Sequence, residues 1–144
     1  MRPRFTTIVL TASLSAIGCA ARTRSPEPVP LDRVECARCR MLISSDRGGG
    51  EIVSSSEDTR FYDDIGCLAA DWVAHRADAL AYVRLAGGQW SEAHAASYAQ
   101  PNGVETPMGS GFAAFATIAD ARAADRAGRV LTFDDVVALT GAKQ

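Results

Sequence analysis

The order of short strand-like runs and helical patterns is the feature that most constrains the fold. Residues 51–53 and 59–62 predict two strands, 65–76 a helix and 80–85 a third strand that ends at two glycines. A similar order follows: strands at 96–99, 112–116 and 129–133, with an Ala-rich helix at 118–127 and a final short helix to residue 139. We therefore expect an α+β fold of two small ββαβ modules, residues 34–88 and 89–144, which duplication of one module would explain.

Smaller features complete this prediction. Residues 41–43 predict a short strand, and a short helix is expected to begin at Trp90. Two pairs of acidic residues stand before helices: Asp63 and Asp64 before 65–76, and Asp134 and Asp135 before the last helix. Aspartate accepts hydrogen bonds from the free N–H groups of a first helical turn, so we interpret both pairs as helix caps rather than as catalytic groups.

The N-terminus predicts export and a lipid anchor. Residues 1–18 hold two arginines and then a short run of apolar and small residues, which is typical of a secretory signal peptide. Small residues directly precede Cys19, as in a bacterial lipobox, so we expect Cys19 to carry lipid in the mature chain. The remainder of segment 19–33 mixes charge with proline, and we expect it to be a flexible tether.

Composition and motifs exclude several functions. The formal net charge is -2 and no stretch is strongly basic, which argues against binding to nucleic acid. The sequence has no serine–histidine–acid pattern, phosphate-binding glycine loop or His-Glu-x-x-His motif. We therefore expect a binding protein rather than an enzyme.

The cysteines indicate where the chemistry lies. If Cys19 is lipidated, Cys36, Cys39 and Cys67 remain, and three thiols cannot all pair within one chain. Cys36 and Cys39 are close enough in sequence to bind one ion or to bridge each other. Cys67 opens the predicted helix, where the helix dipole would stabilise its thiolate.

Two methionines make copper the preferred metal. In an extended segment Met41 would point to the same side as Cys39, and Met108 lies in a Pro-Met-Gly loop with little core to fill. Thioethers suit soft Cu(I) and are poor ligands for zinc. The predicted metal ligands are Cys39, Met41, Met108, Cys36 and Cys67. His75 and His94 belong to no motif, and we expect both to lie on the surface or to pack.

Two alternatives stay open at this point. The first is a structural or regulatory zinc site formed by Cys36, Cys39 and Cys67 with one histidine. The second is a thiol–disulfide oxidoreductase, which would need Cys39 at the start of a helix in a thioredoxin-like fold. A strand-like run follows Cys39 instead, so we rank this alternative last.

Five motifs together resemble the NosL family, the copper lipoproteins associated with nitrous oxide reductase. They are, in order, the lipobox that ends at Cys19, Cys36-x-x-Cys39-x-Met41, Phe61-x-Asp63-Asp64-Ile65-Gly66-Cys67, Trp90-Ser91-Glu92-Ala93 and Pro107-Met108-Gly109. The match covers almost all of residues 34–137. The resemblance implies paired ββαβ modules and a Cu(I) chaperone, anchored on the periplasmic side, that supplies nitrous oxide reductase or a related copper enzyme. It points first to Cys39 and Met41 as ligands and then to Met108, while Cys36 and Cys67 belong to a subset of the family.

Overall fold

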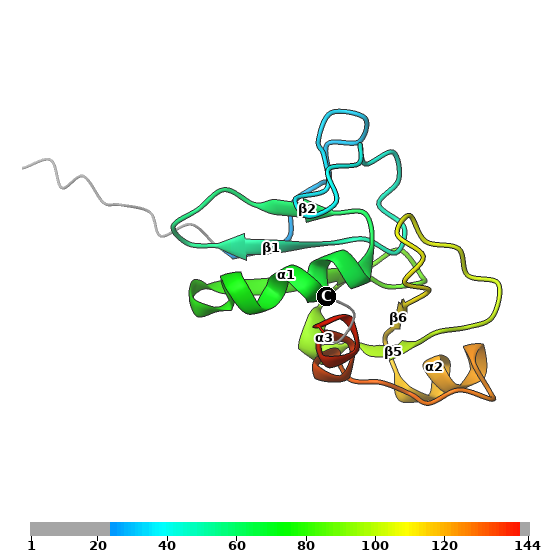
Figure 1. The fold of residues 1–144 in the computed structure, drawn as a ribbon. Helices are drawn as coiled ribbons and strands as arrows, with labels where there is room; N and C mark the ends of the chain where they lie inside the picture. Colours follow the sequence, from blue (N-terminus) through cyan, green and yellow to red (C-terminus); the bar gives the residue numbers. More distant parts are fainter. Residues whose placement is uncertain (1–23, 142–144) are drawn as a thin grey trace, which may run out of the picture.

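The first half of the chain forms a four-stranded antiparallel sheet covered by one helix. The computed structural model describes residues 24–141. Strands β1 (Gly50–Ser54), β2 (Arg60–Tyr62), β3 (Ala79–Arg84) and β4 (Trp90–Glu92) pair in the order β2-β1-β3-β4. Helix α1 (Ile65–His75) and a 3-10 turn, η1 (Arg76–Asp78), connect β2 to β3. Figure 1 shows α1 lying along one side of these strands, where its apolar face packs against the sheet.

The second half repeats the pairing order in a reduced form. A 3-10 turn, η2 (Ala93–Ala95), leads to β5 (Ser97–Ala99), which pairs with β6 (Ala113–Phe115). Tyr98 in β5 also bridges Leu131 on its other side, so β5 takes the central place that β1 holds in the first half. Helices α2 (Ile118–Ala124) and α3 (Phe133–Gly141) complete this half. An α+β fold is thus confirmed, while duplication stays a prediction.

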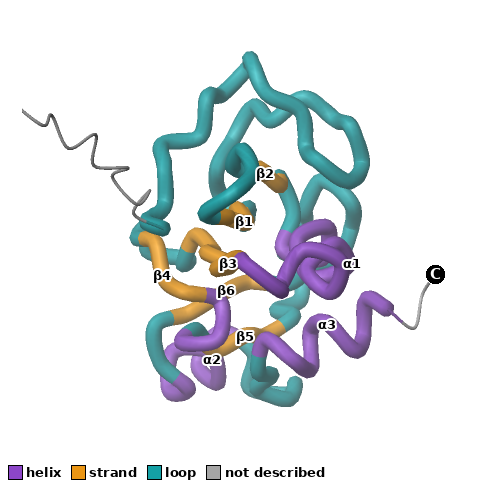
Figure 2. Tube along the Cα trace, turned by 90° about the vertical axis from the view of Figure 1, so that its left-hand side faces the viewer, coloured by secondary structure: helices purple, strands orange, loops and turns teal. Residues whose placement is uncertain are grey.

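Two contacts join the halves into one body. Leu85, just after β3, forms a parallel bridge with Ala114 in β6, and the amide of Ala86 donates to the Ala114 carbonyl at 2.8 Å. Helix α3 packs on α1, where the Phe133 ring meets Trp72 edge-on at a centroid distance of 6.0 Å. In Figure 2, α1 and α3 lie near each other, and long loops gather at the top of the view, close to α1.

Three local predictions were wrong. Residues 90–92 form the edge strand β4 rather than a helix, and Trp90 lies under the Arg84 guanidinium, 4.4 Å from its ring centre. Residues 129–133 and 41–43 contribute only single bridges, through Leu131 and Leu42. Runs of two or three apolar residues carry too little periodicity to separate a strand from a loop.

The caps of the helices differ in part from the prediction. Asp64 caps α1, because its side chain accepts from the Gly66 amide at 2.6 Å. At α3, however, the Asp135 amide donates to the Thr132 hydroxyl at 3.2 Å, and the Asp135 carboxylate accepts from the Thr132 amide at 2.8 Å. Thr132 and Asp135 therefore form a capping box, and Asp134 stays exposed.

Residues 24–30, which the sequence predicts as part of a tether, lie against the sheet face opposite α1. The Tyr82 hydroxyl donates to the Arg24 carbonyl at 2.7 Å, and the Glu27 amide donates to the carboxylate of Glu51 at 2.8 Å. The predicted signal peptide and Cys19 lie outside the described residues. Within residues 24–141, no helix has the length and apolar character needed to cross a membrane.

Candidate metal centre

Three cysteines and one aspartate converge at the start of α1. The Sγ atoms of Cys36, Cys39 and Cys67 and a carboxylate oxygen of Asp63 all lie within 4.8 Å of one another. Two sulfur ligands of one zinc-sized ion, each about 2.3 Å from it, can be at most about 4.6 Å apart. The four groups are therefore close to the spacing that one metal ion requires.

A tight turn presents Cys36 and Cys39. The Cys36 amide donates to the Met41 carbonyl at 2.8 Å, and the Arg40 amide donates to the Cys36 carbonyl at 3.0 Å. Arg40 has a φ of 67°, in the left-handed region that glycine adopts at least cost. The Ala37 amide donates to the Phe61 carbonyl at 2.8 Å, which fixes the turn against β2. Both thiols are thus directed toward the residues that follow β2.

Those residues supply the other two groups. Asp63 and Asp64 connect β2 to α1, and both are buried, at 3% and 0% exposure. Asp64 turns toward the helix and caps it, whereas Asp63 faces the cysteines and accepts from the Cys39 thiol at 3.7 Å. Cys67 lies in the first turn of α1 and is buried. The cap therefore fixes Cys67 and Asp63 relative to each other.

Asp64 also holds the loop that carries Met108. Its second carboxylate oxygen accepts from the Thr106 hydroxyl at 2.7 Å and from the Met108 amide at 3.1 Å. The loop lies close to the helix at Gly66, where an added Cβ would be 2.7 Å from the Ser110 Cβ. A larger residue at position 66 would displace this loop, so glycine there allows the close approach.

The two methionines face solvent, and each lines a cavity that borders the cluster. Met41 is 46% exposed and lines a surface cavity of about 320 Å³ together with Asp63 and Pro107. Met108 is 52% exposed and lines a second cavity, of about 210 Å³, together with Cys67. Both side chains offer a soft thioether sulfur at the surface, next to cavities that border the cluster.

The electrostatics of the cluster differ from the sequence-based expectation for Cys67. A side-chain hydrogen bond between Cys67 and Cys36 lowers the pKa of the Cys36 thiol to about 4 and raises the pKa of Cys67. The lower thiol pKa therefore belongs to Cys36 rather than to the helix-opening Cys67. Burial raises the pKa of the Cys39 thiol and, together with the neighbouring Cys36, raises that of Asp63 to about 6. Binding of a metal would displace the protons that remain on this cluster.

The structure thus brings together Cys36, Cys39 and Cys67, with Met41 and Met108 beside them. Asp63 was missed, since its position before a helix suggested a cap. Its orientation depends on the turn at residues 36–41, which packs there from far along the sequence. The available signal was the pair itself: two adjacent residues in an extended segment point to opposite sides, so only one of Asp63 and Asp64 could cap the helix.

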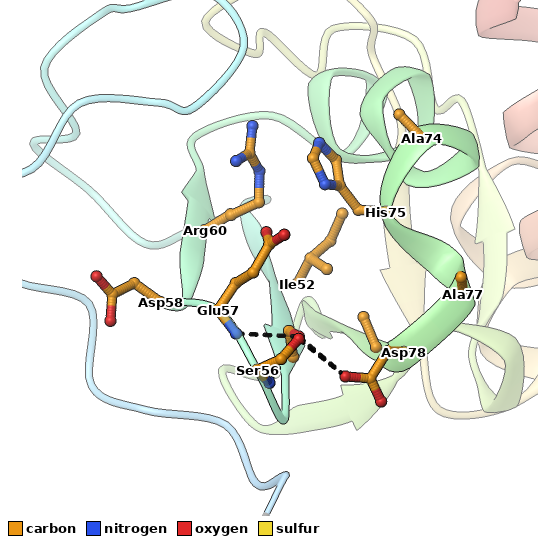
Figure 3. A pocket seen from close by; sticks show the side chains of 11 residues that line it. Ile52, Ser56, Glu57, Asp58, Arg60, Ala74, His75, Ala77 and Asp78 are labelled. Atoms are coloured by element: carbon orange, nitrogen blue, oxygen red, sulfur yellow. Dashed lines mark hydrogen bonds between the residues drawn. The ribbon is translucent and has the colours of Figure 1, made fainter.

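Neither histidine belongs to this centre. His75 ends α1, eight residues from Cys67, which is about 12 Å along the helix axis. It lines a separate cavity of about 140 Å³ between the β1–β2 turn and the end of α1 (Figure 3). His94 packs its ring on Phe133, with the ring centres 4.9 Å apart.

Comparison with known proteins identifies the family of this chain. The NosL family model matches residues 28–139. The chain belongs to the NosL family. Its fold is similar to that in the crystal structure of the copper chaperone NosL from Shewanella denitrificans, with a TM-score of 0.68 and 20% sequence identity over 78% of this chain and 95% of that one. A comparison with curated protein sequences found no match.

The donor set of this NosL-family chain fits a soft metal. Three thiols gather around one carboxylate, two thioethers line the neighbouring cavities, and sulfur of both kinds favours Cu(I). The thiols lie inside and the thioethers outside, so an ion here would contact both protein and solvent. This arrangement suits a carrier, because an ion enclosed by four protein ligands leaves slowly.

Proposed function

We propose that this chain is a Cu(I) carrier that holds one ion at the outer sulfur atoms of Cys39, Met41 and Met108. The observation that supports it is the placement of Met41 and Met108, which are exposed and line cavities shared with Asp63 and Cys67 of the cluster. Thioether ligands bind Cu(I) and exchange it readily, since they carry no charge. A partner protein could then take the ion by replacing one methionine at a time.

The proposed client is nitrous oxide reductase or another extracytoplasmic copper enzyme. Membership of the NosL family supports this choice, as does the description of the similar solved protein as a copper chaperone. We further propose that lipid on Cys19 anchors the chain on the periplasmic side of a membrane. Loss of anchoring in Cys19→Ser, measured by membrane fractionation, tests that part separately.

Anaerobic titration against a competing Cu(I) chelator tests the binding. The parent chain is expected to bind one Cu(I), and Cys39→Ser to weaken binding at least about a hundredfold, or roughly 3 kcal/mol. Met41→Leu should weaken it about tenfold. Leu42→Ala is the matched control, because Leu42 is a neighbouring exposed side chain without sulfur. Absence of Cu(I) binding, or equal losses in Met41→Leu and Leu42→Ala, would refute the proposal.

A zinc site is the second candidate, and Asp63 favours it. Three cysteines and a carboxylate form a donor set that tetrahedral zinc accepts. In this zinc site, Asp63 takes the place of the histidine ligand that was expected from the sequence. Metal analysis of the Met41→Leu variant separates the two candidates, because a zinc site would lose no affinity when a thioether is removed.

A thiol–disulfide oxidoreductase has no comparable support. Such an activity would require Cys39 to begin a helix, whereas the turn at Cys36–Cys39 leads into an irregular segment before β1. The family and the similar copper chaperone also favour a metal carrier.

A further inference from the structure

The metal centre contains more thiols than a Cu(I) carrier needs. Cys39, Met41 and Met108 already offer three sulfur atoms, and Cu(I) accepts low coordination numbers. Cys36 and Cys67 remain, and they are the two most enclosed of the three thiols, at 0% and 6% exposure. A second role for this inner pair would explain its presence.

The inner pair has the geometry for oxidation to a disulfide. The sulfur atoms of Cys36 and Cys67 lie within 4.8 Å of each other, and both residues are buried. The Cys39 thiol points to Asp63, with its sulfur 3.7 and 3.8 Å from the two carboxylate oxygens. Burial and the contact with Asp63 thus distinguish the inner pair from Cys39.

Resting on the proposed function, we propose that Cys36 and Cys67 form a two-electron reductant that converts incoming Cu(II) to the Cu(I) that the outer sulfurs carry. Two Cu(II) ions each gain one electron, the two electrons come from the two sulfur atoms as one S–S bond forms between Cys36 and Cys67, and any proton still bound to either sulfur is released. One Cu(I) stays at Cys39, Met41 and Met108, and the other is released. The step is stoichiometric, and an external dithiol would restore the pair.

The surroundings offer a route for Cu(II). The cavity beside Met41 is also lined by the carboxylates of Asp63 and Glu105, and oxygen ligands suit Cu(II) better than Cu(I). On the other side, Cys67 lines the cavity that contains Met108. An ion that enters at the carboxylates thus lies beside the thiol cluster. Once the ion is reduced to Cu(I), it prefers the sulfur of Met41, which lines the same cavity.

The account is tested with Cu(II) and the fully reduced full-length chain under anaerobic conditions. Every variant carries Cys19→Ser, so that only the three thiols of the centre react. A chromogenic Cu(I) chelator should report two Cu(I) per chain, and the chain should lose two hydrogen atoms in mass. Peptide mapping should place the new disulfide between Cys36 and Cys67. A disulfide between Cys36 and Cys39 would overturn the proposal, and this readout needs no further variant.

Variants separate the inner pair from the outer ligands. Cys36→Ser and Cys67→Ser should each slow Cu(II) reduction more than about tenfold. Cys39→Ser keeps the inner pair, so it should still reduce Cu(II) but retain less of the Cu(I). Reduction at the parental rate in Cys67→Ser would overturn the proposal. Titration with Cu(I) supplied already reduced reports on the carrier function alone, so failure of reduction and failure of binding remain distinguishable.

Discussion

Two adjacent aspartates at the start of α1 have different roles, and the difference matters for the site. Asp63 faces the thiols, whereas Asp64 accepts hydrogen bonds from Gly66, Thr106 and Met108. Asp64 therefore connects the helix that carries Cys67 to the loop that carries Met108. The sequence predicts only a helix cap at Asp64. In the structure Asp64 also links the Met108 loop to the helix that carries Cys67.

Replacement of Asp64 tests this link. Asp64→Ala leaves the Thr106 hydroxyl and the Met108 amide without their acceptor, so we expect the free energy of unfolding to fall by about 1–3 kcal/mol. Cu(I) affinity should fall too, because Met108 loses its position. Asp134→Ala is the matched control at an exposed aspartate in the first turn of α3, with an expected change within about 0.5 kcal/mol. Urea denaturation measures the stability of both variants. Equally small losses of stability in Asp64→Ala and Asp134→Ala would contradict the linking role of Asp64.

Residue-scale prediction from the sequence succeeded where the interaction is local. The cap at Asp64 follows from its position before the helix, and capping needs only neighbours in sequence. The role of Asp63 and the protonation of Cys67 depend on Cys36, which lies about thirty residues earlier and meets them only after folding. No local pattern could assign the lower thiol pKa to Cys36 rather than to Cys67.

At the scale of elements, β1 carries a buried charge that the segment before Leu31 covers. Glu51 is fully buried, with one oxygen accepting from the Glu27 amide and the other without a hydrogen-bond partner among the described residues. Burial raises the pKa of the Glu51 carboxyl to about 7. An ordinary glutamate in an unfolded chain has a pKa of about 4.3. Between that pH and about 7, the folded chain therefore keeps a proton on Glu51 that the unfolded chain has lost.

The free energy of unfolding should therefore fall as the pH rises from about 4.5 to about 7. Glu51→Gln removes the charge and keeps an oxygen for the Glu27 amide, so it should flatten this dependence. At pH 8 the variant is expected to be more stable than the parent by an amount on the order of 1 kcal/mol or more, and at pH 4 the two should be similar. Denaturant titration at both pH values measures the difference. A variant less stable than the parent at pH 8 would contradict the buried charge.

Most elements were predictable, and the main exception depends on a tertiary contact. Helix α1 and strands β1, β2 and β3 appear within one or two residues of their predicted limits. The strand β4 was mistaken for a helix start, since Ser91 and Glu92 fit a cap. Its pairing with the edge of β3 is a tertiary contact that overrides the local pattern.

At the scale of the whole molecule, the two halves share one core. The rings of Trp72, Tyr98 and Phe133 come from both halves and pack within 6.0 Å of a neighbouring ring centre. The metal centre also draws on both, with Met41 before β1 and Met108 between β5 and β6. The sequence predicted paired modules, but short strands cannot indicate how closely the modules join.

We therefore expect the chain to unfold as one cooperative unit. Phe133→Ala removes a buried ring from the shared core and should cost about 3–5 kcal/mol. Ile118→Ala, at a side chain that is 59% exposed, should change stability little. Tryptophan fluorescence and circular dichroism, followed together during denaturation, should give coincident transitions. Separate transitions for the two signals would show that the halves fold independently.

X-ray absorption at the copper edge of the Cu(I)-loaded chain tests the central claim most directly, since it reports the oxidation state and the ligand atoms together. We predict Cu(I) in a shell of sulfur atoms that loses one sulfur in Met41→Leu and one in Met108→Leu. A shell that includes an oxygen, with spectra unchanged in both methionine variants, would place the metal among Cys36, Cys39, Cys67 and Asp63 and contradict the account.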